Sequence, residues 1–304
     1  MINLIMESKP YIFTGRKGNE FVEDFDSSRF MRMEFEPFLV EGSEPLKNAV
    51  KRGEIQEEDT VLVVGRGGEY RAFSMYQMTY NKVAQGSLNG LPYLATYCPI
   101  CHTGTAMVPV IDGKEFHFRC VGVHNGIAML QDRETDSYWN HVTGECVEGP
   151  LKGKKMDMLL LGQMTARQAL KKYPNLHLSL AKQSWLHRML TPIMNYFGKH
   201  GIYPPGYKKT IIKRDERLPD MTSGVGVFTK EEQKFYPIDT IEKAGGKLSD
   251  RLAGRPVTVI VDEDGFPEAY YEDTEDGEDI PQYLYTRWFG FSITYPGCKI
   301  HQAG

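Results

Sequence analysis

One stretch of the sequence has residue types and spacing that suit redox or metal chemistry: "CPICH", from Cys98 to His102. A Cys-x-x-Cys pair followed directly by a histidine fits a covalently bound haem, a thiol–disulfide exchange site or a metal site. Covalent haem normally requires export to an oxidising compartment. The first residues, "MINLIMESKPYIF", contain an apolar run too short for a signal segment, so haem is the weakest of the three interpretations.

Thiol–disulfide exchange at Cys98 and Cys101 is the second interpretation. In redox sites of the Cys-Pro-x-Cys kind, a helix that begins at the first cysteine lowers the pKa of its thiol. Here Thr103, Gly104 and Pro109 predict a loop and a hairpin after the second cysteine. The main source of thiolate stabilisation is therefore missing, and thiol exchange remains an alternative.

Metal binding is the interpretation that uses most of the nearby side chains. Two thiolates, Cys98 and Cys101, can reach one ion from a tight turn, and Cys120 and His124 follow in the pattern Cys-x2-Cys-x18-Cys-x3-His. That spacing lies within the range of tetrahedral sites for soft metal ions. His102 is a further candidate ligand. The sequence thus predicts a metal site with these five residues as candidates.

The strand that carries Cys120 offers a second explanation for that residue. In "EFHFRCV", alternation places Phe116, Phe118 and Cys120 on one face of a strand, so Cys120 could be an ordinary core cysteine. His124 lies in "GVHNG", a turn-like setting in which an imidazole can be aimed freely, although a loop histidine is often just polar surface.

The elements around the cysteines predict an α+β fold of mixed, β-rich sheets with short helices. We expect an irregular lead-in over residues 1–55 and a single α+β domain over residues 56–304. Local patterns in the domain predict a helix over residues 76–86 that stops at Gly86, a two-residue hairpin turn at Asp112-Gly113 and a helix over residues 165–174 capped by Thr165. Within the domain, the pattern indicates the following segments: a strand–turn–strand–helix–strand unit at 60–98, a Cys-x-x-Cys and hairpin block at 98–160, a helical excursion at 183–208 and a second copy of the unit at 225–265.

The proposed duplication aligns Val64 with Val227 and "FSM" at 73–75 with "YPI" at 236–238. The alternative is that two ordinary α+β segments share turn residues by chance. In the first copy the last strand ends in the cysteine pair, and in the second it ends in "DEDG", a plain turn at 262–265. The cysteines are therefore an elaboration of the unit and not a requirement of it.

Composition limits the classes of function. The 304 residues are 41% hydrophobic and 25% charged, with a net charge of −4, which is ordinary for a soluble globular protein and disfavours a nucleic-acid partner. No stretch approaches the ~20 apolar residues of a membrane span, so we expect no membrane partner. Five cysteines, an odd number, argue against a disulfide framework and, with no leader, favour a cytoplasmic location.

The chain resembles a known family, catalogued as domain of unknown function 3179. The resemblance covers roughly residues 60 to 300. It is carried by "LPYLATYCPICHTG", "FRCVGVHNG", "SYWNHVTGECVEGPLKGKKM", "KFYPIDTI" and "RWFGFSITYPGCKI". The residues that fall on the family pattern are Cys98, Cys101, Asn125, Trp139, Thr143, Gly144, Glu145, Gly149, Pro150 and Trp288. Cys120 and His102 depart from it, and the resemblance implies no particular reaction.

If the shared core is the cysteine pair with a polar residue near positions 124 and 125, a bound ion keeps open positions, which catalysis requires. Asn125 and Glu145 are then candidate catalytic residues, with Glu145 as proton donor or acceptor. His141 is a third candidate, as a group that orients a ligand. The alternatives are a hairpin turn for Glu145 and a structural role for His141.

We therefore predict a metal-dependent oxidoreductase that uses copper, iron or zinc, because two thiolates with imidazole favour soft or borderline ions. Its small-molecule substrate is unknown, and residues 183–208 could form a contact between copies of the chain. Two alternatives remain: a thiol–disulfide oxidoreductase at Cys98 and Cys101, and a non-enzymatic domain with a closed zinc site made by Cys98, Cys101, Cys120 and His124.

Overall fold

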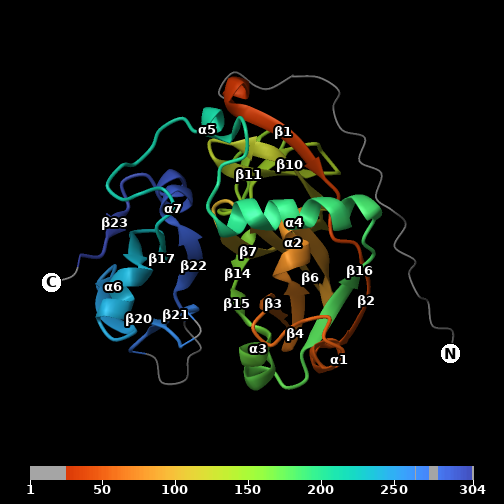
Figure 1. Ribbon diagram of the computed structural model, residues 1–304. Coiled ribbons are helices and arrows are strands. Elements are labelled where there is room, and N and C mark those ends of the chain that lie inside the picture. The colour runs from red at the N-terminus through yellow and green to blue at the C-terminus, as the bar shows by residue number, and fades with distance from the viewer. Residues whose placement is uncertain (1–24, 264, 274–279, 303–304) are drawn as a thin grey trace.

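The computed structural model describes residues 25–263, 265–273 and 280–302. Figure 1 shows several mixed sheets with short helices, which confirms the predicted α+β, β-rich fold. The lead-in up to residue 24, and with it the expected lack of a leader, lies outside the described residues. In the part of the chain that is described, no helix is both long enough and apolar enough to cross a membrane.

The first sheet has five strands. Its order is β15 (Leu161–Thr165), β3 (Thr60–Arg66), β4 (Glu69–Ser74), β16 (His177–Ala181) and β2 (Val40–Pro45). Helices α1 (Leu46–Lys51) and α3 (Ala166–Lys172) pack on one face of this sheet. The predicted threonine cap of α3 is confirmed, since Thr165 and Gln168 form a capping box.

The other face of this sheet packs against a four-stranded sheet. Its order is β14 (Asp157–Leu159), β7 (Thr103–Val108), β6 (Leu91–Cys98) and β5 (Val83–Leu88). Helix α2 (Met75–Asn81) connects the two sheets. The prediction of a helix continuing to Gly86 was wrong, because Lys82 adopts a left-handed conformation with φ 63° and the chain then pairs with β6.

A third sheet has the order β1 (Phe30–Phe35), β10 (Phe118–His124), β11 (Ile127–Asp132), β12 (Tyr138–Asn140) and β13 (Cys146–Glu148). The short 3₁₀ turn η1 (Ser27–Arg29) precedes it. The predicted Asp112-Gly113 turn is confirmed: both residues have positive φ and join β8 (Val110–Ile111) to β9 (Lys114–Glu115). The lead-in is less irregular than expected, because β1 and β2 pair with β10 and β16.

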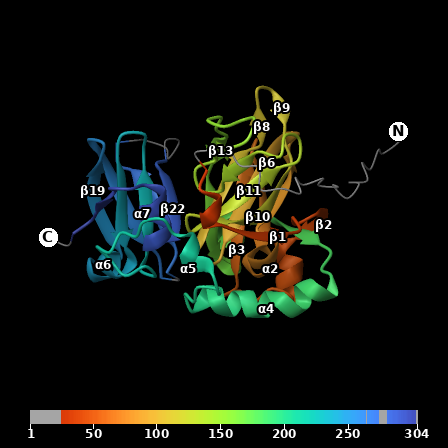
Figure 2. The same cartoon turned by 90° about the horizontal axis from the view of Figure 1, so that it is seen from above.

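The helical excursion contains α4 (Trp185–Lys199) and α5 (Tyr207–Thr210). The chain then builds two further sheets. One has the order β22 (Gln282–Arg287), β17 (Ser223–Phe228), β18 (Gln233–Pro237) and β23 (Lys299–Ile300), and the other β19 (Lys247–Leu252), β20 (Arg255–Val261) and β21 (Pro267–Tyr271). Helices α6 (Ile238–Lys243) and α7 (Trp288–Thr294) belong to this region, which lies beside the first sheets in Figures 1 and 2.

The same order of elements occurs in two segments of the chain, although each has two strands after its helix where the predicted unit has one. We call β3-β4-α2-β5-β6 the first unit and β17-β18-α6-β19-β20 the second unit. In the first, Val64 pairs with Arg71, and in the second, Val227 pairs with Lys234, so the aligned valines occupy the same register. The second hairpins also agree, since Leu88 pairs with Leu91 and Leu252 with Arg255.

Candidate metal centre

The cysteine pair occupies the turn between β6 and β7. Cys98 is the last residue of β6 and pairs with Thr103, the first residue of β7, so the four residues between them form a tight reversal. His102 closes the reversal with φ 54°. The expected absence of a helix after Cys101 is confirmed, and the centre therefore lacks the helix dipole of thioredoxin-like sites.

Residues from the second half of the chain hold this turn. The backbone carbonyl of Cys101 accepts hydrogen bonds from the Arg287 backbone N–H (2.8 Å) and from the hydroxyls of Thr103 (3.1 Å) and Thr286 (3.3 Å). The Arg287 guanidinium donates to the carbonyls of Ile100 (2.7 Å) and Gly198 (2.6 Å). The turn is therefore fixed between β22 and α4.

Two glycines allow these elements to approach the turn. A Cβ atom at Gly290 in α7 would lie 2.8 Å from the Cβ of Cys101. A Cβ atom at Gly198 in α4 would lie 2.8 Å from the Cβ of Pro99. Real Cβ atoms do not approach so closely, so both positions require glycine for the observed packing.

His141 reaches the cysteines from the loop after β12. The side-chain carbonyl of Asn140 accepts hydrogen bonds from the backbone N–H groups of Val142 (2.8 Å) and Thr143 (3.3 Å), which turns the chain directly after the strand. The His141 side chain consequently points into the protein, where only 1% of its surface is exposed.

A chain of hydroxyl groups fixes the tautomer of His141. The Thr105 hydroxyl donates to the His141 backbone carbonyl (2.5 Å), so its single proton is used there. In the contact between the hydroxyls of Thr96 and Thr105 (2.6 Å), Thr96 must then be the donor. Thr96 can therefore only accept from His141 Nδ1 (3.1 Å), which places the ring proton on Nδ1 and leaves a lone pair on Nε2.

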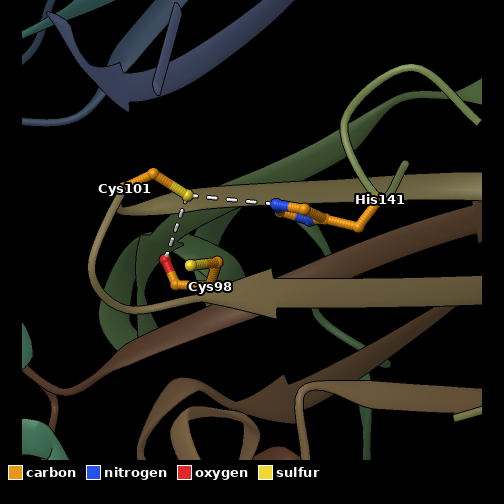
Figure 3. Close-up of side chains that lie close together, drawn as sticks. All are labelled: Cys98, Cys101 and His141. Atoms are coloured by element: carbon orange, nitrogen blue, oxygen red, sulfur yellow. Dashed lines mark hydrogen bonds between the residues drawn. The ribbon is translucent and has the colours of Figure 1, made fainter. Parts of the chain in front are cut away.

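The lone pair of His141 points at the cysteines. Its Nε2 lies 3.9 Å from the sulfur of Cys101, as Figure 3 shows. One sulfur each from Cys98 and Cys101 and one nitrogen of His141 all lie within 4.8 Å of one another, and all three residues are buried. This donor set suits a single metal ion. With metal–sulfur bonds of about 2.3 Å and metal–nitrogen bonds of about 2.0 Å, the donors need to move by only a small amount.

Burial and hydrogen bonding set the charges of the three donors. Burial lowers the pKa of His141 to about 3, so the imidazole is neutral, as a metal ligand must be. A hydrogen bond from Cys101 lowers the pKa of Cys98 against the opposing effect of burial, and Lys82 adds to the lowering. Burial raises the pKa of Cys101. Cys98 is therefore the thiol that loses its proton more easily.

Lys82 is a buried cation close to these sulfurs. Its ammonium group donates to the Thr79 carbonyl and lies 5.2 Å from the centre of the Phe35 ring. Burial lowers the pKa of Lys82 to about 8, and the charges of nearby cysteines, Cys98 foremost, act in the opposite direction. A positive charge at this position stabilises thiolates.

Other predicted ligands lie outside the group that the described residues form. His102 Nε2 accepts from the Gln163 side-chain amide (2.9 Å), and its Nδ1 lies 3.3 Å from the Tyr97 hydroxyl. Cys120 packs in the core with Phe116 and Phe118, as the strand alternation predicts. Burial raises the pKa of Cys120 to about 12.

His124 and the remaining predicted catalytic residues also lie elsewhere. The ring of His124 stacks on Phe25 with centroids 4.2 Å apart. The Asn125 side-chain carbonyl accepts from the Ile212 backbone N–H (3.0 Å) and holds the segment after α5. Glu145 is exposed, and its backbone forms an isolated antiparallel β-bridge with Lys155. Of the three predicted catalytic residues, only His141 joins the cysteines, and its position is that of a ligand.

The sequence contained part of the signal for His141. Thr96 and Thr105 are cross-strand partners beside the Cys98–Thr103 pair, and "NHVTG" has an asparagine directly before the histidine. The contact between β6 and the loop after β12 is long-range in sequence, and no local pattern specifies it.

The family model described as "Protein of unknown function (DUF3179)" matches residues 43–292, which include the cysteine turn, His141 and the Arg287–Gly290 segment that holds the turn. The comparisons with curated proteins and with solved structures found no match.

Proposed function

The chain belongs to the DUF3179 family of proteins of unknown function, and we propose that it is a metal-dependent oxidoreductase whose ion is bound by Cys98, Cys101 and His141. The observation that carries this proposal is the convergence of three buried donors with the Nε2 lone pair of His141 directed at the sulfur of Cys101. Histidine ligands commonly donate their other ring N–H to a fixed acceptor, which is the role of Thr96 here.

The donor set favours copper, iron or zinc, and it supports an open site. Two thiolates and an imidazole are soft or borderline donors. Among the described residues no fourth histidine, cysteine or carboxylate joins the group, whereas closed structural zinc sites use four protein ligands. A bound copper or iron ion would supply one-electron chemistry at the remaining position.

The protein's own residues would prepare the site for that ion. Arg287 and Gly290 hold the cysteine turn in place, and the hydroxyl chain keeps His141 unprotonated at Nε2. Lys82 offsets the negative charge of two thiolates inside the core. Burial of all three donors excludes bulk water from the sulfurs and protects them from oxidation.

Elemental analysis of purified variants tests the proposal. Cys98→Ala is expected to reduce bound metal from about one ion per chain to less than about a tenth, because it removes a thiolate ligand. The matched control is Cys298→Ala, which removes a buried cysteine from a different cluster and should keep the metal. If Cys98→Ala retained more than about half of the metal, the assignment of the ligands would be wrong.

Thiol–disulfide exchange is a second candidate, because Cys98 has the lowered pKa and Cys101 the raised one that such a pair uses. The Cys98 thiolate would attack a substrate disulfide, form a mixed disulfide and release the first substrate thiolate. The Cys101 thiolate would then attack the Cys98 sulfur, form the Cys98–Cys101 disulfide and release the second substrate thiolate. The substrate leaves as two thiols, and the pair is oxidised. A free-thiol count under denaturing conditions separates the candidates: metal-free protein with a Cys98–Cys101 disulfide favours exchange, and a full count with stoichiometric metal favours the metal centre.

A further inference from the structure

Helix α4 carries its large apolar side chains on the face that points away from the protein. Trp185, Met189, Ile193 and Tyr196 follow one another at helical spacing and form one stripe. Their exposed fractions are 73%, 54%, 51% and 58%. Leu186, with 38% exposed, widens this stripe, which we call the α4 outer stripe.

The opposite face of α4 attaches the helix through small and polar residues. His187, Thr191, Asn195 and Gly198 have the same spacing, offset by half a turn. The Asn195 side-chain carbonyl accepts from the Thr79 hydroxyl (3.1 Å), and the His187 ring lies 4.0 Å from the ring of Tyr80. A surface helix ordinarily buries its apolar side chains, whereas α4 packs Phe197 against the core and leaves the five residues of the outer stripe exposed.

The exposed charges of the segment that carries the outer stripe are basic, and two acidic side chains from elsewhere lie at its edge: Glu36 lies 3.8 Å from His187, and Asp220 pairs with Arg214. Residues 181–214 contain no Asp or Glu, in a chain whose net charge is −4. Their exposed basic residues are Lys182, Arg188, Lys199, Lys208, Lys209, Lys213 and Arg214. Arg188 and Lys199 flank the stripe on α4 itself, so this side of the molecule combines apolar and positive surface.

These two features select the kind of partner. In a symmetric dimer both copies contribute the same surface to the interface, so the basic residues of one copy would face the basic residues of the other. An anionic bilayer, in contrast, offers phosphates to the basic residues and an apolar region to the stripe. Figure 2 shows α4 along an outer side of the molecule, where it can reach a flat surface.

We propose that the α4 outer stripe docks the protein on an anionic lipid bilayer, with the helix lying in the plane of the interface. Trp185, Met189, Ile193 and Tyr196 enter the headgroup region, and the basic residues contact lipid phosphates. This departs from the expectation of no membrane partner, which rested on the lack of a spanning segment that an interfacial helix does not need. The inference is independent of the proposed metal chemistry.

Vesicle binding by the full-length protein tests the proposal. We expect co-sedimentation with vesicles of phosphatidylcholine and phosphatidylglycerol at low salt, and at least about tenfold weaker binding to phosphatidylcholine alone or in high salt. Trp185 is an intrinsic probe, because Trp139 and Trp288 are fully buried. Its fluorescence should shift to shorter wavelengths on the anionic vesicles only.

Two variants identify the surface. Met189→Glu with Ile193→Glu alters exposed positions and should reduce vesicle binding by about tenfold or more while circular dichroism stays unchanged. Leu91→Glu is the control, since Leu91 is 43% exposed and lies at the start of β6. It should bind like the unaltered protein.

Several outcomes would overturn the proposal. These are no binding to anionic vesicles, equal binding to neutral ones, or full binding by the folded double variant. Light scattering supplies a further one: a dimer that the double variant dissociates, without vesicle binding, would make the stripe a contact between copies of the chain.

Discussion

The two units of the molecule share element order and strand register, but their second hairpins continue into different turns. The second unit passes from β20 to β21 through a turn in which the Asp262 side chain accepts from the Phe266 backbone N–H (2.9 Å) and the Asp262 carbonyl accepts from Gly265 N–H (3.0 Å). One bond comes from outside, since the Asp262 carboxylate also accepts from the Gln168 side-chain amide (2.5 Å). In the first unit the corresponding turn carries Cys98 and Cys101 and is held by Thr286 and Arg287 from outside. The first turn is therefore held by more hydrogen bonds from outside than the second, and these additional bonds fix the backbone that carries the cysteines.

The position that follows the helix, α2 in the first unit and α6 in the second, also differs between the two units. In the second unit Ala244 ends α6 with φ −84°, and Gly245, which aligns with Lys82, follows it with φ 82°, a conformation that glycine adopts without strain. In the first unit Lys82 occupies this position with φ 63° and is buried beside the cysteines. A strained, buried cation in place of glycine indicates that the position is used for function.

The largest expected effect, on stability and on metal binding, comes from a side chain placed at Gly290, where the absence of one leaves room for the cysteine turn. Gly290→Val places a side chain against Cys101 and should lower the free energy of unfolding by roughly 2 to 3 kcal/mol, with loss of bound metal. Chemical denaturation and elemental analysis measure the two effects. Gly42→Val is the matched control, because a Cβ there has no neighbour within 4 Å, and its stability should change by less than about 0.5 kcal/mol.

The next effect is on metal affinity. It compares the Thr96–Thr105 hydroxyl chain of the first unit with the Ser249–Thr258 hydroxyl pair of the second unit. Thr105→Val frees the Thr96 proton to point at His141 Nδ1, which would move the ring proton to Nε2. Metal affinity, measured by competition with a chelator, should fall roughly 10- to 100-fold. Thr258→Val, which breaks the Ser249–Thr258 hydroxyl contact between β19 and β20, should leave it unchanged. An equal loss of metal affinity in both variants would contradict the proposed role of the Thr96–Thr105 hydroxyl chain.

A smaller effect on metal affinity is expected when the positive charge of Lys82 is removed. Lys82→Met keeps most of the buried length and removes the cation, so metal affinity should fall by about tenfold or less, equivalent to about 1.4 kcal/mol. Thermal stability should not fall, because a desolvated ammonium group is removed as well. Lys234→Met, which removes one of the partners of Asp250 in the second unit, should show the reverse: lower stability with unchanged metal affinity.

The smallest effect concerns the second unit alone. Burial would raise the pKa of Asp250, but hydrogen bonds from Lys234, the Arg251 backbone and His301 outweigh it and lower the pKa to about 2. The stabilisation is therefore present above the ordinary carboxyl pKa and disappears as the pH falls from about 4 to about 2. Asp250→Asn should lower the free energy of unfolding at neutral pH by about 1 kcal/mol and flatten its dependence in that acid range. A slope that stays as steep as in the unaltered protein would contradict this.

The sequence predicted the local elements of the fold well, for identifiable reasons. Turn residues such as Asp112-Gly113 and the Thr165 cap act within a few residues and specify their structure directly. The end of α2 was predicted too late because apolar spacing continues through Val83, and the left-handed conformation of Lys82 has no signal in a lysine. Strand β1 was missed because it is an edge strand whose pairing with β10 is distant in sequence.

The candidate site was predictable in part. The cysteine pair and its position at the end of a strand follow from spacing and composition. The spacing of Cys120 and His124 suggested ligands, yet strand β10 carries Cys120 into the core and His124 against Phe25. His141 lies beside the cysteines because β11 and β12 bring its loop to β6, and Arg287 reaches the turn through contacts between the two units. Such contacts depend on tertiary packing and have no local signature.

X-ray absorption at the metal edge of the purified protein directly identifies the atoms bound to the ion. If Cys98, Cys101 and His141 are the ligands, the ion should have two sulfur neighbours at about 2.3 Å and one imidazole nitrogen at about 2.0 to 2.1 Å. The nitrogen should be lost in His141→Ala, and Cys98→Ala should bind too little metal to give a signal. A centre with four sulfur neighbours, or one without sulfur, would contradict the assignment of Cys98, Cys101 and His141.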